Sequence, residues 1–358
     1  MTKLLKKLDF TGQPIFIGID VHLKSWNISV YLQQQYLTSF NQPPTTLALQ
    51  TFLQNSYPNA SYKCAYECGF CGYWIQRELL SLGIECIVIN AADVPQTDKT
   101  AKNKTDTNDS KRIAQALQAG FLQPIYIHPD EEVEADRQLV RCNEKFTNDL
   151  TRVKNRIKGM LYHLGIKLPE YFSNSNWSNL FIKWLKELEL KNPSAKRAIQ
   201  HQLTMAENIR IQKLAVLKDI RVLLKKDRYS ATAKYILTVP GIGTVTTATL
   251  LTEIDNMKRF SNFEQLNSYI GYYPSQFSSG ENIHQGNIIG RQHKRLRSLI
   301  IEAAWTAIRT DPAMTMVYNQ FKLKVGGKRA IIKVARKLLS RIRHVWLNQV
   351  EYEKGVIR

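Results

Sequence analysis

Short apolar runs separated by polar breaks dominate the N-terminal part of the chain, a pattern typical of β-strands that alternate with helices. Residues 15–32, IFIGIDVHLKSWNISVYL, predict two strands with a break at residues 22–25. The order that follows is strand, helix, strand, helix, strand and helix, which predicts a mixed α/β sheet. Further strands are expected at residues 36–40, 63–66 and 85–90, and helices at 45–53, 72–82 and in the second half of 102–117.

Helical periodicity replaces the strand pattern in the middle of the chain. Residues 131–164 and 195–226 each carry apolar side chains on one helical stripe, with basic residues between them. Two helices of similar length that flank a short segment predict an antiparallel hairpin or a dimerisation coiled coil. The first stripe repeats at heptad spacing and consists of Phe146, Leu150, Val153, Ile157, Met160 and Leu164; the second is looser and consists of Leu203, Ala206, Leu217, Ile220 and Leu224.

The C-terminal third is predicted to be mainly helical, with helices at residues 299–308 and 330–345. Before them, VPGIG separates two apolar segments within residues 234–254 and is similar to a helix-hairpin-helix. In that motif Gly241 and Gly243 would let backbone N–H groups approach a phosphate, and a simple helix-turn is the alternative. The patterns predict three domains: a mixed α/β domain at 1–127, the helical hairpin at 128–230 and a mainly helical domain at 231–358.

Four acidic residues coincide with the ends of predicted elements. Asp20 ends the first strand, Glu67 follows the fourth, and Asp106 and Asp109 begin the next helix, three residues apart. Taken singly, each has a structural explanation as a turn residue, a cap or a favourable charge at the positive end of a helix dipole. Taken together, they match the ribonuclease H/RuvC-like arrangement, in which clustered carboxylates hold two Mg²⁺ or Mn²⁺ ions for phosphoryl transfer.

Basic residues outnumber acidic ones by a wide margin: 50 Lys and Arg against 30 Asp and Glu leave a net charge of +20. Such an excess, spread along the chain, predicts a nucleic-acid partner bound through its phosphates. A membrane surface is the lesser alternative, because no amphipathic terminal helix supports it. The candidate contacts lie beside the acidic helix, in a cationic C-terminal segment and at the start of the last helix: Lys104, Lys111, Arg112, Arg291, Lys294, Arg295, Arg297, Lys328 and Arg329.

The N-terminus has no apolar stretch long enough for a signal peptide, and no window reaches transmembrane length. An intracellular, cytoplasmic protein is therefore expected. The five cysteines fit free thiols in a reducing compartment. Cys68 and Cys71 form a C-x-x-C, but no second pair stands at ligand spacing, so the pattern does not support a zinc site.

Two consecutive serines, Ser278 and Ser279, precede Gly280 in a stretch that resembles a turn. On its own such a segment is simply a turn. Because a cationic cluster follows it, a hydroxyl there would lie close to a bound phosphate. No Ser-His-Asp order is evident, so a peptidase or esterase has little support.

Several segments form a recognisable set. In the N-terminal half they are GIDVHLKSW, Glu67-x-Gly69 and the K-x-D-x-x-D of Lys104, Asp106 and Asp109. In the C-terminal half they are VPGIG, GYYPSQFSSG, GRQHKRLR and KVARKLL. Together they resemble the DEDD transposases of insertion sequences, which are related to the Piv DNA invertases and are described as bridge-RNA-guided recombinases. The resemblance covers nearly the whole chain.

This resemblance implies that the four acids form the metal-binding set of a RuvC-like domain. It also implies that the serine directly before the glycine, Ser279, is the nucleophile, with Ser278 as the alternative because the serine is doubled. The implied reaction cuts and rejoins donor and target DNA through a phosphoserine intermediate. The implied partners are a structured guide RNA encoded by the element and further copies of the chain, as a homodimer or tetramer.

Two other functions stay open at the level of sequence. A RuvC-like, Mg-dependent nuclease or junction resolvase would use water as its nucleophile and leave the serine with a structural role. A non-catalytic RNA- or DNA-binding protein would share the basic charge. Binding alone, however, does not need four carboxylates clustered against a polyanion.

Overall fold

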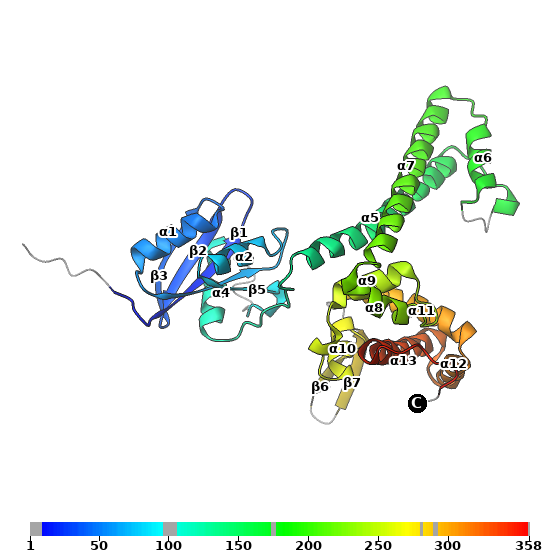
Figure 1. Cartoon of the computed structure of the whole chain (residues 1–358). Helices are drawn as coiled ribbons and strands as arrows, with labels where there is room; N and C mark the ends of the chain where they lie inside the picture. The colour runs from blue at the N-terminus through cyan, green and yellow to red at the C-terminus, as the bar shows by residue number, and fades with distance from the viewer. Residues whose placement is uncertain (1–8, 96–105, 173–176, 280–281, 289–292, 357–358) are drawn as a thin grey trace, which may run out of the picture. The chain divides into compact units, whose positions relative to one another are not determined.

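The chain folds into two compact units, residues 1–127 and 128–358 (Figure 1). Separate apolar clusters stabilise them, so each unit has its own core. The boundary predicted at residue 230 lies inside the second unit. The computed structural model describes residues 9–95, 106–172, 177–279, 282–288 and 293–356, with the backbone alone for 106–107, 274–279 and 282–288.

The first unit is built on a five-stranded sheet. Its strands are β1 (Pro14–Val21), β2 (Trp26–Leu32), β3 (Gln35–Gln42), β4 (Ser61–Glu67) and β5 (Glu85–Ile89), in the spatial order β3-β2-β1-β4-β5. β1 pairs antiparallel with β2 and parallel with β4, while β3 and β5 extend the sheet antiparallel and parallel at its two edges. The mixed, ribonuclease H/RuvC-like sheet predicted from sequence is confirmed.

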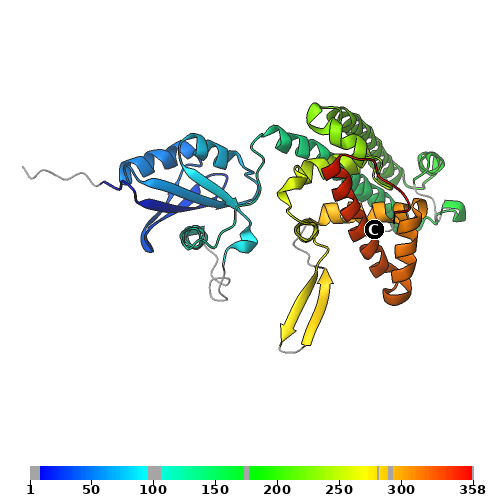
Figure 2. The same cartoon turned by 60° about the horizontal axis from the view of Figure 1, so that its bottom comes forward.

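Helices cover both faces of this sheet, as Figure 2 shows. They are α1 (Thr46–Ser56), α2 (Trp74–Ser81) and α4 (Asp106–Gln118). Successive strand residues face opposite sides. On one side Ile15, Ile17 and Ile19 of β1 are fully buried in a cluster with residues of α1 and α2. On the other side Ile113 and Ala116 of α4 are buried against the sheet.

Gly18 lets α4 rest directly on β1. A Cβ atom at this position would lie 2.0 Å from the carbonyl oxygen of Ser110 and 2.6 Å from the backbone nitrogen of Ala114. Real side chains do not approach a backbone this closely, so only glycine permits the contact. The steric contact therefore fixes the depth at which α4 packs.

A buried polar cluster fixes α4 along the strand direction as well. The Ser110 hydroxyl lies 2.5 Å from Asn27 Oδ1 and 2.7 Å from the Ser29 hydroxyl oxygen. Ser110 and Ser29 are fully buried. A shift of α4 along the sheet would break both bonds to Ser110, and a buried polar group that loses its partner costs about 1–3 kcal/mol.

The second unit begins with a helical hairpin. Its helices are α5 (Glu132–His163), α6 (Asn179–Glu187) and α7 (Pro193–Leu223), and α5 and α7 run side by side in opposite directions (Figure 1). This confirms the predicted hairpin. The short helix α6 was not predicted; its Phe181 and Leu185 are buried with Ile157 of α5 and Leu203 of α7, in a small core at the far end of the hairpin.

The heptad spacing predicted for α5 holds only in part. Val153 and Ile157 are buried, but the next buried residue is Leu161, and Leu164 is 40% exposed. A straight α-helix has 3.6 residues per turn, so its buried stripe drifts away from a strict 3.5-residue seam. The placement of Leu164 in the apolar stripe is therefore wrong.

The C-terminal helices share one large apolar core with the base of α5 and α7. They are α8 (Asp227–Ile236), α9 (Thr244–Ile254), α10 (Phe263–Ile270), α11 (Lys294–Thr310), α12 (Pro312–Val325) and α13 (Gly327–Asn348). α11 and α13 contain the helices predicted at 299–308 and 330–345, whereas α10 and α12 were not predicted. Among the described residues, no helix is long and apolar enough to cross a membrane.

We expect Gly18→Ala to destabilise the packing of α4 by about 1–3 kcal/mol, because the added methyl group forces the helix away from the sheet. Hydrogen exchange of the α4 amides in the full chain measures this effect. Gly69→Ala is the matched control, since a Cβ there meets nothing closer than 4.0 Å. Wild-type exchange rates in α4 of Gly18→Ala would contradict the steric role of Gly18.

Candidate active site

Asp20 and Glu67 occupy adjacent positions at one end of the sheet. They belong to the parallel neighbours β1 and β4, whose register pairs Ile19 with Tyr66. Asp20 and Glu67 each come one residue later, and Glu67 is the last residue of β4. Parallel strands present their carboxyl ends at the same edge, so this register brings two acidic positions together.

Helix α4 brings Asp109 to the same edge. Asn27 is the β2 partner of Asp20, and its side chain binds the hydroxyl of Ser110, the residue after Asp109. The N-terminal end of α4 therefore lies at the end of β1 that carries Asp20. Asp106 is the first residue of α4, and its side chain lies outside the described part of the structure.

Two of these acids contact basic side chains. Asp20 Oδ2 lies 3.2 Å from His22 Nε2, and Asp109 Oδ1 accepts a hydrogen bond of 2.7 Å from Arg112 Nη1. The second pair is largely buried, with 17% of the Asp109 side chain and 14% of the Arg112 side chain exposed. Charge-assisted bonds of this kind hold a carboxylate in a defined orientation.

The donor chemistry at this edge suits a hard cation, because Mg²⁺ and Mn²⁺ prefer carboxylate oxygens. Among the side chains that the structure describes, no three from His, Cys, Asp and Glu form a group that could hold a metal ion. The predicted set of four includes Asp106, whose side chain is not described. The fold thus brings Asp20, Glu67 and the start of α4 to one edge, and metal binding there is a proposal.

The two predicted nucleophile positions lie in a β-hairpin of the second unit. Its strands are β6 (Pro274–Ser279) and β7 (Asn282–Ile288), and their register pairs Ser279 with Asn282 and Ser278 with Ile283. Both serines thus belong to a strand, although the sequence resembles a turn; Gly280 lies outside the described residues. Figure 2 shows the hairpin extending away from the helices of its unit.

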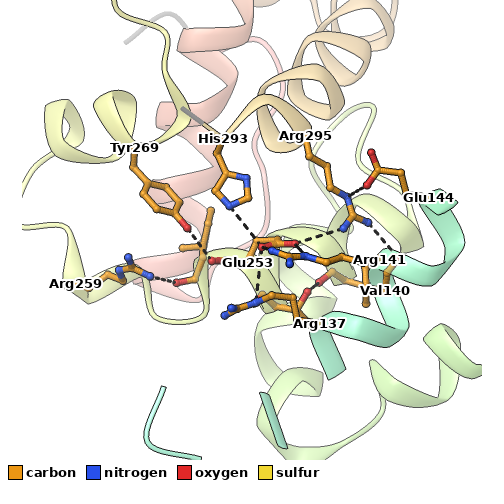
Figure 3. A network of polar contacts seen from close by, with 12 residues as sticks. Arg137, Val140, Arg141, Glu144, Glu253, Arg259, Tyr269, His293 and Arg295 are labelled. Atoms are coloured by element: carbon orange, nitrogen blue, oxygen red, sulfur yellow. Dashed lines mark hydrogen bonds and ion pairs between the residues drawn. The ribbon is translucent and has the colours of Figure 1, made fainter. Parts of the chain in front are cut away.

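Glu253 of α9 is a buried carboxylate among cationic side chains (Figure 3), with 2% of its side chain exposed. Arg141 of α5 binds it through two bonds, Nε–Oε1 and Nη2–Oε2, each 2.8 Å long. Arg295 lies 3.4 Å from Oε1, while His293 and Arg137 lie 3.5 and 3.7 Å from Oε2. We call these five residues the Glu253 cluster.

The surrounding cations keep Glu253 ionised. Burial alone would raise its pKa, but hydrogen bonds from His293 and Arg141 and the charge of Arg141 outweigh burial and lower the pKa to about 2. The pKa in the folded protein thus lies below its ordinary value of 4.5. The resulting stabilisation is complete above pH 4.5 and is lost as the pH falls towards 2.

The Glu253 cluster also anchors both ends of the segment that carries the serine hairpin. Before the hairpin, the Tyr269 hydroxyl donates to the Glu253 carbonyl oxygen at 3.1 Å. After the hairpin, His293 contacts the Glu253 carboxylate, and its backbone N–H donates to the Tyr269 carbonyl oxygen at 3.4 Å. Glu253 therefore contacts residues on both sides of the hairpin, through its carbonyl oxygen before it and through its carboxylate after it.

Glu253 is not among the site residues predicted from sequence. One feature of the sequence could have identified Glu253. It is the one charged residue in the otherwise apolar and threonine-rich helix TVTTATLLTEI. An acid on such a helix is buried and needs cationic partners. Its partner Arg141 lies 112 residues away along the chain, so no local pattern could reveal the pair.

The basic residues predicted to contact nucleic acid differ in their exposure and in their partners within the protein. Three are exposed and form no ion pair with a described carboxylate: Lys294, Lys328 and Arg329. Four have partners within the protein: Lys111 over the Tyr36 ring, Arg112 with Asp109, Arg295 in the Glu253 cluster, and Arg297 with the Gly271 carbonyl oxygen. The other two, Lys104 and Arg291, lie outside the described residues.

The VPGIG segment forms the turn between α8 and α9, and its two glycines differ in their surroundings. Gly241 has a φ of +81°, and a Cβ there would lie 2.3 Å from the Ala303 carbonyl oxygen of α11. Helix packing is thus sufficient to require glycine at 241. Gly243 is the N-cap of α9, has open space at its Cβ position and provides no side-chain cap. Both glycines are exposed, and the predicted phosphate contact remains a proposal for each of them.

Glu253→Gln is expected to lower the free energy of unfolding at pH 7 by about 3 kcal/mol, because it leaves buried cations without their counter-charge. Urea unfolding over a pH series measures this. The difference from wild type should shrink as the pH falls from 4.5 towards 2, where wild-type Glu253 takes up a proton. A difference that does not change with pH would contradict the assignment.

Glu144→Gln is the control for this experiment. Glu144 binds the same Arg295 at 2.7 Å, but 44% of its side chain is exposed. An exposed ion pair contributes at most about 1 kcal/mol, so this variant should stay close to wild type at every pH.

Two family profiles match the chain. The profile DEDD_Tnp_IS110, described as a transposase, matches residues 17–165 and includes all four acids. The profile described as "Transposase IS116/IS110/IS902 family" matches residues 233–319 and includes the Glu253 position and the serine hairpin.

Curated proteins are similar over much of the chain. A putative transposase of Sinorhizobium fredii, y4qE, is 28% identical over 245 residues, which are 68% of this chain and 58% of that protein. The transposase for insertion sequence element IS1533 of Leptospira borgpetersenii is 24% identical over 306 residues, 81% of this chain and 84% of that protein. The pilin gene-inverting protein of Moraxella bovis is 34% identical over 111 residues, 30% of this chain and 34% of that protein. The chain belongs to the IS116/IS110/IS902 family of transposases.

Proposed function

We propose that this protein cuts and rejoins DNA as the transposase of an insertion sequence, with Ser279 as nucleophile. In this proposal Asp20, Glu67, Asp106 and Asp109 are the metal-binding acids. The observation that carries the proposal is the convergence of β1, β4 and α4, with their acids, at one edge of a ribonuclease H/RuvC-like sheet. Membership of a transposase family supports the same function.

The chemistry of the proposed step is a phosphoryl exchange. The Ser279 oxygen attacks a DNA phosphorus, so a P–O bond to serine forms and the P–O bond to one deoxyribose oxygen breaks. The serine loses its proton, and the departing oxygen gains one as it becomes a free hydroxyl. Rejoining is the reverse attack by a deoxyribose hydroxyl on the phosphoserine. The phosphoserine conserves the energy of the broken bond, so rejoining needs no external energy source.

The residues around the acids have supporting roles in this proposal. Mg²⁺ or Mn²⁺ held by the four carboxylates would supply positive charge to the phosphoryl oxygens. His22 and Arg112 orient Asp20 and Asp109, as their contacts of 3.2 and 2.7 Å indicate. Preorganised side chains of this kind lower the cost of binding a cation and a phosphate together.

The proposed partners are DNA and a structured guide RNA. The RNA would pair with donor and target DNA, so that base pairing selects the sites and the protein binds shapes and backbones. A net charge of +20 suits two polyanionic partners. We also propose that the working form of the protein is a homodimer or a tetramer.

Ser279→Ala is expected to abolish the covalent protein–DNA adduct, and Ser278→Ala to retain it, because the adduct is an ester of one specific hydroxyl. Full-length protein is incubated with DNA that spans an element end and with RNA transcribed from the adjacent non-coding segment, and adducts are resolved on denaturing gels. Cleaved DNA without an adduct in the wild type would favour the water-dependent nuclease. Loss of the adduct in Ser278→Ala alone would assign the nucleophile to Ser278.

Asp20→Asn and Asp109→Asn are each expected to slow adduct formation at least about 100-fold, because a hard cation loses an anionic ligand. RNA binding measured by fluorescence anisotropy should not weaken. Asp149→Asn is the matched control, since Asp149 on α5 is exposed and pairs with Arg152. Wild-type rates in both site variants would exclude these acids from the reaction.

A further inference from the structure

A groove of about 930 Å³ lies between α5, α6 and α7. Its apolar lining includes Leu203, Ala206 and Leu217 of α7. Figure 1 shows α6 beside the far ends of the two long helices.

Cationic side chains dominate the charged lining of the groove. Five of them, Lys154, Lys183, Lys186, Arg210 and Lys213, face a single acid, Glu207. Glu207 is matched by Lys186 at 2.7 Å. In the part of the chain that the structure describes, Lys154, Arg210 and Lys213 form no ion pair with a carboxylate.

These unmatched cations disfavour one another's charge. Burial lowers the pKa of Lys154, and the neighbouring charges of Lys213, Arg210 and Lys158 lower it further. A bound anion would remove this repulsion and favour full protonation of Lys154. The groove is therefore complementary to a ligand that carries negative charge.

An aromatic ring is the second recognition element of the groove. Trp177 lines it, and Lys154 Nζ lies 5.4 Å from the centre of the Trp177 ring. Phe181 supports the same ring edge-on, with ring centres 5.1 Å apart. A buttressed aromatic ring beside cations offers a stacking surface for a base next to contacts for its phosphates.

We propose that this groove binds an unpaired segment of RNA, with a base against Trp177 and flanking phosphates at Lys154, Arg210 and Lys213. The inference rests on the RNA partner in the proposed function and gives that partner a site. Double-stranded DNA does not fit, because its bases are stacked inside a rigid duplex and cannot stack on the Trp177 ring.

The position of the groove favours RNA over single-stranded DNA. Lys154 lies thirteen positions after Arg141 of the Glu253 cluster on α5, which corresponds to about 20 Å along a helix. DNA is unpaired only where a strand is opened for reaction, whereas the loops of a folded RNA are unpaired at rest. A site remote from the anchored serine hairpin therefore suits RNA.

The test uses the full-length protein and a fluorescent, unstructured RNA of twelve nucleotides, with DNA of the same sequence in single- and double-stranded form. The groove variant is Lys154→Gln with Lys213→Gln. Its RNA affinity is expected to fall at least about 10-fold, and the salt slope by roughly 1.4, about 0.7 for each lost phosphate contact. Trp177→Leu should also weaken RNA binding, whereas Trp177→Phe should retain it.

The control is Lys145→Gln with Lys218→Gln, which removes the same charge from exposed positions on the same two helices outside the groove. An unchanged melting temperature shows that the groove variant folds, as expected when like charges are removed. RNA binding equal to the control overturns the inference. An equal loss for duplex DNA, or competition by single-stranded DNA as strong as by RNA, overturns the assignment to RNA.

The adduct assay separates this inference from the proposed function. If wild-type protein forms the Ser279 adduct but the groove variant binds RNA like its control, the groove inference fails and the function stands. If no adduct forms but the groove variant loses RNA binding, the function fails and the groove stands.

Discussion

The buried charge of Glu253 is the interaction on which the second unit depends. One carboxylate joins Arg141 and Arg137 of α5 to Arg295 of α11 and to His293 just before it. Removing a carboxylate from water is costly, and only several well-placed cations offset that cost. These contacts restrict how α5, α9 and α11 pack against one another. The serine hairpin is attached to this arrangement, because Tyr269 before it and His293 after it both contact Glu253.

In the first unit, the packing of α4 on the sheet is fixed without a buried charge. There, a missing side chain at Gly18 lets a helix backbone touch a strand, and buried hydroxyl groups set the position of the helix along it. Steric exclusion is effective over a few tenths of an ångström, which makes it a precise way to place a helix end. The acids at this edge therefore owe their arrangement to residues that take no part in chemistry themselves.

The sequence was most informative where structure follows from local patterns. The apolar runs within residues 15–32 predicted β1 and β2, and the helical pattern of residues 330–345 predicted α13. Strand ends then located Asp20 and Glu67 at one edge. How the N-terminal end of α4 packs at this edge could not be predicted, because it depends on contacts of Gly18 and Ser110 with distant segments.

What the sequence did not reveal depends on contacts between distant segments. The β6–β7 hairpin lacks strong alternation, so its two serines resembled a turn. The buried stripe of α5 shifts to Leu161 because the helix follows its own twist rather than a heptad repeat. The role of Glu253 can be recognised only from its ion pairs with Arg141 of α5 and Arg295 of α11.

The continuity of α5 has a consequence for insertions and deletions. This helix of 32 residues carries Arg137 and Arg141 near one end and the Lys154 side of the groove nearer the other. Each residue added between them would lengthen the rod by about 1.5 Å and rotate the groove by about 100° relative to the Glu253 cluster. A change in hairpin length therefore keeps the groove close to its direction only when it adds nearly whole turns, about 7 or about 11 residues, with a matching change in α7. The geometry of the α-helix thus restricts the hairpin to a few allowed lengths.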